Sequence, residues 1–325
     1  MKRRALLLAL VLLSASASAK APRIRAVDAV GITVADMDRS VDFYTRVLGF
    51  TSVSDIEVAG EAYERLRDVF PIRMRVVRLR LGQESLELTE YLAPRGRAAP
   101  IDARSNDRWF QHVAIVVRDM DRAYELLHDQ RVTYVSPEPQ RLPDWNPTAG
   151  GIRAFYFRDP DGHPLELIWF PPGKGDPRWQ EPTDGLFLGI DHTAIAVADT
   201  KKSLAFYRDR LGFRVAGGSE NSGPEQERLN AVRGAHLRIT SLRADDGPGI
   251  EFLEYLAPRN GRAFPAHEHA NDLVHWQTRL VLGDGAALEH LGRVPPVTVP
   301  SHELGFRRAL SVRDPDGHTL EIVER

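Results

Sequence analysis

Short apolar runs with strict alternation recur along the chain and predict β-strands with one buried face. "SLELTEYL" (residues 85–92) and "GIEFLEYL" (249–256) alternate apolar residues with glutamate, and so do "PLELI" (164–168) and "TLEIV" (319–323). Successive side chains of a strand point to opposite faces. Each run therefore places its leucine and isoleucine residues on one face and a glutamate on the other.

A second pattern predicts a helix after certain strands. In "HVAIVVRDMDRAYELL" (112–127), an apolar run ends at Asp119 and a helical period follows, and Asp36 and Asp199 precede similar stretches. Aspartate is a favoured N-cap. Gly49 and Gly212 stand where a helix-terminating glycine belongs. The predicted unit is strand–helix–strand–strand–strand, and it occurs four times, at residues 26–95, 109–170, 188–258 and 273–325.

Long internal repeats group these units into two halves. "DMDRSVDFYTRVLGF" (36–50) matches "DTKKSLAFYRDRLGF" (199–213), and "EYLAPR" and "RDPDGH" also occur twice. The predicted fold is α+β, with two tandem domains at 24–171 and 187–325. The Pro- and Gly-rich residues 172–186 between them are predicted to form a linker.

The N-terminus reads as a secretory signal peptide rather than as part of the fold. "MKRR" precedes nine apolar residues, and an Ala-x-Ala pattern ends at Ala19. The apolar stretch is too short for a membrane span, which needs roughly 20 residues. Residues 1–19 are therefore predicted to be removed, giving a periplasmic or secreted protein without a membrane anchor. The formal net charge of −2 does not indicate the strongly basic surface that binds nucleic acid. The absence of cysteine excludes thiolate chemistry.

The first strand of each unit places one residue near its start on the face opposite its large apolar residues. His112 and His192 each share a face with small residues, Gln277 stands at the same place in the fourth unit, and Ala29 in the first. A lone glutamate on a strand is ordinarily a solvated outer residue. Four glutamates of matching parity, two of them with a matching histidine, instead favour a shared cavity.

The motifs "FYTRVLGF", "FYRDRLGF" and the two "DPDGH-x-LE" stretches make the chain resemble the vicinal oxygen chelate superfamily, which includes glyoxalase I, extradiol dioxygenases and bleomycin-resistance proteins. The resemblance implies βαβββ modules that pair into open barrels, each around one divalent metal. It also implies ligands from the first and last strand of each module. The corresponding pairs are Ala29 and Glu87, His112 and Glu166, His192 and Glu251, and Gln277 and Glu321.

Two ways of pairing the modules remain open. Sequential pairing gives one site with Glu87, His112 and Glu166 and another with His192, Glu251, Gln277 and Glu321. Swapped pairing, of the second module with the third, collects His112, Glu166, His192 and Glu251 in one site. Such nitrogen and oxygen donors suit Fe, Mn, Co, Ni or Zn.

Further residues receive roles from their strand faces. Glu166 and Glu321 are candidate catalytic bases. Tyr91 and Tyr255 share the face of the glutamates and are candidates to line a substrate pocket. Arg279 is a candidate for binding a substrate carboxylate, with a salt bridge at the rim as the alternative. His163 and His318 are assigned to the turn rather than to the site.

The predicted function is a metal-dependent lyase, isomerase or oxygenase that acts on a small oxygen-rich molecule, in a monomer or homodimer. Glyoxalase I itself is disfavoured because Thr33 or Ala196, and Tyr91 or Tyr255, replace the Arg and Asn of its glutathione-binding pattern. Two alternatives stay open. One is a metal-free or vestigial small-molecule-binding protein of the bleomycin-resistance type, and the other is an extradiol ring-cleaving dioxygenase.

Overall fold

The computed structural model describes residues 23–284 and 286–325. The predicted signal peptide, residues 1–19, lies outside this range. Within the described part of the chain, no helix is long and apolar enough to cross a membrane.

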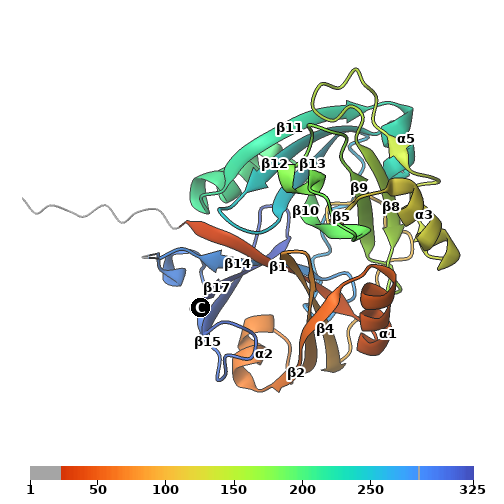
Figure 1. Ribbon diagram of the computed structural model, residues 1–325. Coiled ribbons are helices and arrows are strands. Elements are labelled where there is room, and N and C mark those ends of the chain that lie inside the picture. Colours follow the sequence, from red (N-terminus) through yellow and green to blue (C-terminus); the bar gives the residue numbers. More distant parts are fainter. Residues whose placement is uncertain (1–22, 285) are drawn as a thin grey trace, which may run out of the picture.

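Each of the four predicted modules begins with a strand and ends with antiparallel strands (Figure 1). The first contains β1 (Ile24–Val34), α1 (Met37–Asp42), η1 (Phe43–Val47), β2 (Thr51–Ala59), α2 (Glu61–Arg67), β3 (Arg73–Leu81) and β4 (Glu84–Ala93). The second contains β5 (Gln111–Val117), α3 (Met120–Asp129), β6 (Thr133–Tyr134), β7 (Gln140–Arg141), β8 (Arg153–Arg158) and β9 (Pro164–Trp169). The third contains β10 (Phe187–Val197), α4 (Thr200–Leu204), η3 (Ala205–Arg210), β11 (Arg214–Ser222), α5 (Pro224–Asn230), β12 (His236–Arg243) and β13 (Gly249–Ala257). The fourth contains β14 (Trp276–Leu282), η4 (Leu288–His290), β15 (Val297–Thr298), β16 (Arg308–Arg313) and β17 (Thr319–Glu324).

The predicted helix boundaries are confirmed. The side chains of Asp36, Asp119 and Asp199 cap the helices that follow them by accepting backbone N–H groups. Gly49 and Gly212 have φ angles of 74° and 82°, a region that glycine enters without steric cost. In the fourth module the described residues form only a single 3-10 turn, η4, at the place of the helix.

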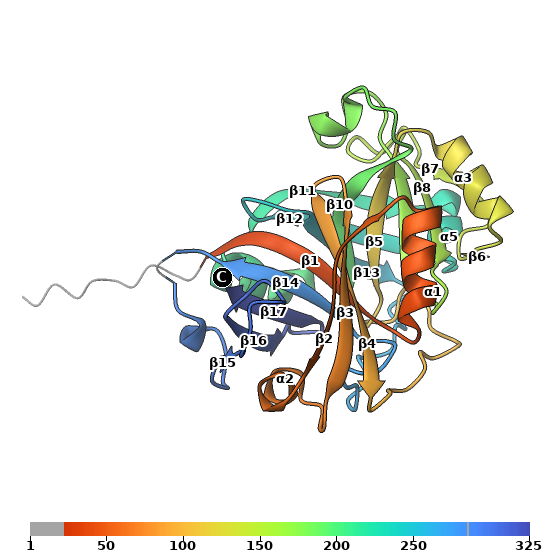
Figure 2. The ribbon, with the colours of Figure 1, turned by 60° about the horizontal axis from the view of Figure 1, so that its bottom comes forward.

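Two curved sheets carry the four modules, and the strand order shows the swapped pairing. The nine-stranded sheet runs β11-β12-β13-β10-β5-β9-β8-β6, with β7 beside β8, and so joins the third module to the second. The eight-stranded sheet runs β15-β16-β17-β14-β1-β4-β3-β2 and joins the fourth to the first. The seams are the antiparallel pairs β5–β10 and β1–β14. The nine-stranded sheet lies in the upper half of Figure 1. Figure 2 shows β1 beside β14 in the eight-stranded sheet from another side.

The two largest hydrophobic clusters, in contrast, mainly follow the order of the chain, whereas two smaller clusters join the same modules as the sheets. One cluster packs the helix-facing residues of the first and second modules together, including Ile32, Leu88 and Phe155. Another does the same for the third and fourth modules, including Phe252 and Leu320. The first and second modules thus share one large cluster and the third and fourth another, while each sheet takes one module from either half of the chain.

The repeated Asp-Pro-Asp-Gly-His turn supports this core. Asp159 Oδ1 accepts the backbone N–H groups of Asp161 and His163, and Oδ2 lies 2.8 Å from His163 Nδ1. Tyr44 of η1 donates its hydroxyl to the same carboxylate. His163 Nε2 lies 2.8 Å from the carbonyl oxygen of Leu273. The turn histidine is therefore a structural residue here, as the sequence indicated, and the turn ties the second module to the first.

Candidate metal centre

Strand register brings four predicted ligands together in the nine-stranded sheet. Across the β5–β10 seam, His192 lies opposite Ala114 and His112 lies opposite Ala194. The same two alanines are the parallel neighbours of Glu166 on β9 and Glu251 on β13. The two modules thus contribute one histidine and one glutamate each, in matching positions about the seam.

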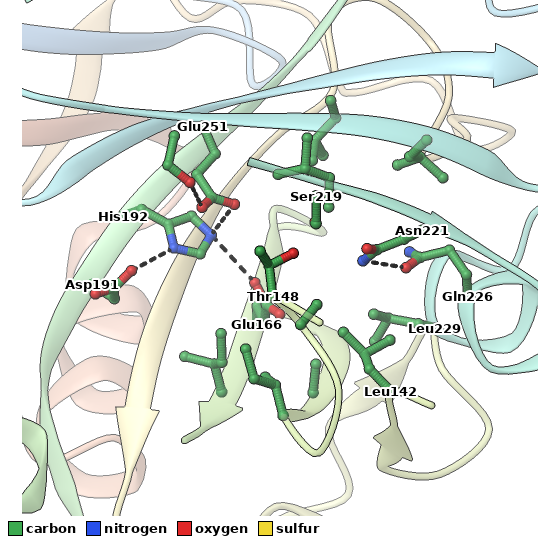
Figure 3. Close-up of a pocket in the computed structure, with 18 of the residues that line it drawn as sticks. Leu142, Thr148, Glu166, Asp191, His192, Ser219, Asn221, Gln226, Leu229 and Glu251 are labelled. Atoms are coloured by element: carbon green, nitrogen blue, oxygen red, sulfur yellow. Dashed lines mark hydrogen bonds and ion pairs between the residues drawn. The ribbon is translucent and has the colours of Figure 1, made fainter. Parts of the chain in front are cut away.

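The four side chains line one cavity. Figure 3 shows three of them, Glu166, His192 and Glu251, facing one another at one end of it. Glu166 Oε2 lies 3.0 Å from His112 Nε2 and 3.6 Å from His192 Nε2. Ligand atoms of these three residues all lie within 4.8 Å of one another. Glu251 Oε2 lies 3.4 Å from His192 Nε2, and its other oxygen accepts a hydrogen bond from Ser241. Glu251 is the most exposed of the four side chains, at 19%.

The histidine geometry fits a metal ion better than a closed hydrogen-bond network. Both ring nitrogens of His112 are buried without a hydrogen-bond partner, although Nε2 is close to Glu166. Buried polar atoms are rarely left without a partner, so such an atom calls for an explanation. Two imidazoles and a carboxylate that face a common point are a usual donor set for divalent transition metals. His112, His192 and Glu166, with Glu251 beside them, would hold that ion.

The residue before His192 fixes the orientation of its ring. Asp191 Oδ2 lies 2.9 Å from His192 Nδ1, so the opposite nitrogen, Nε2, faces the cluster. Arg243 and the indole of Trp179 donate hydrogen bonds to the other carboxylate oxygen of Asp191. Ligand histidines in proteins commonly have such a carboxylate behind them, which sets the tautomer. Trp179 belongs to the segment predicted as a linker, so part of that segment packs behind the site.

The charges of the site are strongly coupled. Burial by itself would raise the pKa of Glu166, but contacts with His112 and His192 outweigh it and lower that pKa to about 2. Burial would lower the pKa of His192, but the charge of Glu251 and the contacts with Asp191 and Glu166 raise it well above its ordinary value. Glu166 therefore stays ionised, while His192 holds a proton when no metal is bound.

The whole cavity has a volume of about 180 Å³, and away from the histidines and carboxylates its lining side chains carry no charge. At the end away from the histidines, Asn221 donates a hydrogen bond to Gln226 at 3.0 Å and accepts one from Asn146 at 2.7 Å. Apolar residues form much of the remaining wall, and no Arg or Lys is among the described lining residues. This amide network was not predicted, because β11, α5 and the loop around Asn146 carry no sequence motif.

The other predicted ligands lie in the eight-stranded sheet, around an arginine. Arg279 Nε lies 2.7 Å from Glu321, and its two terminal nitrogens lie 2.6 and 2.5 Å from Glu87. Gln277 accepts a hydrogen bond from Arg67. Arg279 is 2% exposed and bridges two buried glutamates instead of lying at a cavity rim.

Both predicted substrate-contacting tyrosines are buried in packing clusters. Tyr91 packs with Tyr63 and Val323 in the eight-stranded sheet. Tyr255 packs with Leu229, and its hydroxyl accepts a hydrogen bond of 2.9 Å from Asn230. The tyrosine that lines the cavity is Tyr156 on β8, whose ring centroid lies 4.8 Å from that of His112.

Paired βαβββ modules around a cluster of two histidines and a carboxylate define a class of glyoxalase-like proteins that generally hold a divalent metal. The match to known sequences agrees with this class. Residues 26–167 and 189–322 match the family model of the Glyoxalase/Bleomycin resistance protein/Dioxygenase superfamily, and the chain belongs to that superfamily.

Individual relatives include enzymes of different reactions. A 2-epi-5-epi-valiolone epimerase of an Actinomyces species is 40% identical over 159 residues, which cover 47% of this chain and 83% of the relative. A lactoylglutathione lyase of Arabidopsis thaliana is 24% identical over 90% of this chain and 88% of its own length. The crystal structure of glyoxalase I from Zea mays superposes with a TM-score of 0.59 at 18% identity, covering 93% of this chain and 92% of that one. The last similarity concerns the fold alone.

Proposed function

We propose that the chain is a metal-dependent isomerase of the epimerase type, acting at a carbon next to a carbonyl in a small, uncharged, hydroxyl-rich molecule. The observation that carries the proposal is the pairing of His112, Glu166, His192 and Glu251 with a small cavity lined by neutral polar and apolar groups. The similarity to an epimerase over about half of the chain supports the reaction type.

The cavity argues against a glutathione conjugate. Its volume of about 180 Å³ lies below the roughly 300–1,000 Å³ of pockets that hold drug-sized ligands. Among the described lining residues there is no guanidinium or ammonium group to bind the carboxylates of glutathione. The side-chain amides of Asn221 and Gln226, held by their own hydrogen bonds, instead match hydroxyl groups.

The two glutamates have different environments and therefore different roles. A bound divalent metal would polarise the carbonyl and lower the pKa of the adjacent C–H. Glu166 is buried with a low pKa and is suited to remain a ligand. Glu251 is partly exposed and lies at the edge of the cluster, where Ser241 holds its carboxylate. Glu251 is therefore the proposed base that removes and returns the proton, in place of Glu166 or Glu321.

Solvent-exchange NMR tests this proposal. The purified protein is incubated in D₂O with 2-epi-5-epi-valiolone, and ¹H NMR follows the signal of the proton next to the carbonyl. The expected result is metal-dependent loss of this signal together with a second stereoisomer, and Glu251→Gln abolishes both. A metal-loaded protein that exchanges no proton in this compound or in related cyclic hydroxyketones contradicts the proposal.

The donor set favours one second candidate. Two histidines and one carboxylate with open positions also form the site of non-haem Fe(II) oxygenases. Oxygen consumption by the Fe(II)-loaded protein with catechols, without proton exchange in hydroxyketones, would favour this reading.

The N-terminal pattern supports a separate proposal of export to the periplasm or medium. N-terminal sequencing of the mature protein is expected to begin after Ala19. An intact Met1 would contradict it.

A further inference from the structure

The eight-stranded sheet, which pairs the first and fourth modules, has an arginine at the place that corresponds to the metal centre. On β14, Arg279 is the parallel neighbour of Glu321, as Ala114 on β5 is the neighbour of Glu166. Its guanidinium binds Glu321 and Glu87, the two carboxylates that would otherwise face a cation. Arg67 also pairs with Glu321, so the two arginines together balance the charges of the two glutamates without a metal.

A large cavity nevertheless remains in this pair of modules. Its volume is about 700 Å³, and it lies between α2 and strands β14, β16 and β17. Five buried polar or charged residues line it: Arg67, Glu268, His275, Gln277 and Thr319. Apolar residues also line it, and two of them, Phe70 and Val294, are 59% and 60% exposed. An apolar lining with a few convergent polar groups is typical of a pocket that binds a small molecule.

Arg67 brings an incomplete set of hydrogen bonds to this cavity. Its side chain is 3% exposed, Nη1 lies 2.8 Å from Glu321, and the same nitrogen donates a hydrogen bond to Gln277. Nε and Nη2 are buried without a partner. These two nitrogens form one edge of the planar guanidinium, the edge that binds a carboxylate through two parallel hydrogen bonds.

Two further unpartnered groups line the same cavity. They are Nε2 of His275 and the hydroxyl of Thr319, both buried. His275 Nδ1 already contacts Glu268, whose other oxygen pairs with Arg313. Both oxygens of Glu268 thus already have partners, and Arg67 Nε and Nη2 have none among the described residues. Buried donors left without a partner are costly, which favours a ligand that supplies the missing acceptor.

We propose that this second cavity is a metal-independent binding site for a small carboxylic acid with an apolar body. The carboxylate is bound by the free edge of Arg67, with His275 and Thr319 completing its hydrogen bonds, and the body lies against the apolar wall. The planar edge binds an oxyanion through two parallel hydrogen bonds, and the apolar lining favours an aromatic or branched carboxylic acid over acetate or inorganic phosphate. The site takes a ligand of opposite character to the neutral substrate of the metal centre and does not depend on that proposal.

Isothermal titration of the folded, metal-loaded chain with benzoate tests the proposal, with inorganic phosphate as the competing anion. Benzoate is expected to bind at one site per chain. Arg67→Lys, which keeps the charge but removes the fork, is expected to weaken benzoate at least tenfold, whereas His112→Ala leaves the affinity unchanged. No benzoate binding, tighter binding of phosphate, or loss of binding in His112→Ala but not in Arg67→Lys overturns the proposal.

A second variant keeps the test decisive if Arg67→Lys does not fold. Thr319→Val preserves the shape of the side chain and removes only an unpartnered hydroxyl. It is expected to weaken benzoate about fivefold, the effect of one hydrogen bond. In the wild-type protein, one arginine Nε–H resonance is expected to shift during the titration. An unchanged affinity in Thr319→Val together with an unshifted spectrum overturns the proposal.

Discussion

The rings of His112 and His192 lie 5.6 Å apart between centroids, although they belong to different repeats of the chain. Their proximity follows from the antiparallel seam between β5 and β10, which places each histidine opposite an alanine of the other strand. The small alanine side chains leave the space into which both imidazoles turn. The pairing of modules, not the order of the domains, therefore determines which residues share a site.

Replacing either histidine should empty the same centre. His112→Ala and His192→Ala are each expected to lower metal affinity by more than about 100-fold, beyond the usual effect of changing an outer-shell residue. Metal analysis of the purified variants measures this. Gln277→Ala in the other sheet is the control and should keep the wild-type metal content. Full metal content in His112→Ala would contradict the shared centre.

The carboxylate behind His192 should tune the centre without binding the metal. Asp191→Asn keeps the shape of the side chain but weakens its hold on His192, and metal affinity should fall about 10–100-fold. Competition with a chelator measures the change. Asp28→Asn is a matched control, because Asp28 holds Arg78 as Asp191 holds Arg243, but with Ala29 after it. An equal effect of both substitutions would mean that the loss is general destabilisation.

Removal of Arg279 should destabilise the fold rather than the metal centre. Arg279→Met leaves Glu87 and Glu321 as buried charges without their main partner, which should cost about 3–5 kcal/mol in the free energy of unfolding. Urea unfolding measures this cost. In a Glu87→Gln and Glu321→Gln background the same substitution should cost less. An equal cost in both backgrounds would show that packing, not charge, is at stake.

Metal binding should release a proton near neutral pH. The raised pKa of His192 means that the metal-free folded protein carries a proton there, and ligation requires the neutral imidazole. The apparent affinity should therefore rise about tenfold per pH unit until the pH passes that pKa, and then level off. Calorimetry in buffers of different ionisation enthalpy counts the released protons. An affinity that stays constant between pH 6 and 8 would argue against a protonated His192.

Local patterns in the sequence predicted the modules, the helix caps and the faces of the glutamates, because alternation and capping depend on neighbouring residues. They did not choose between the two module pairings, since strands β5 and β10 meet only in the folded chain. The position of Arg279 was missed for the same reason. Its face on β14 was predicted, but its two carboxylate partners come from β4 and β17. Trp179 was assigned to a linker because the Pro- and Gly-rich sequence around it gives no sign of a buried contact with Asp191.

The exchange of modules between the two sheets has a consequence for how the centres can differ. Each module lends its first and last strands to one sheet alone, so a substitution on the inner face of β1 or β14 leaves the β5–β10 centre untouched. In a symmetric dimer of half-length chains the same substitution would alter both centres at once. Because all four modules belong to one polypeptide, the two sites can change independently. The nine-stranded sheet can keep its metal ligands while the eight-stranded sheet carries a guanidinium at the corresponding place and binds a different ligand.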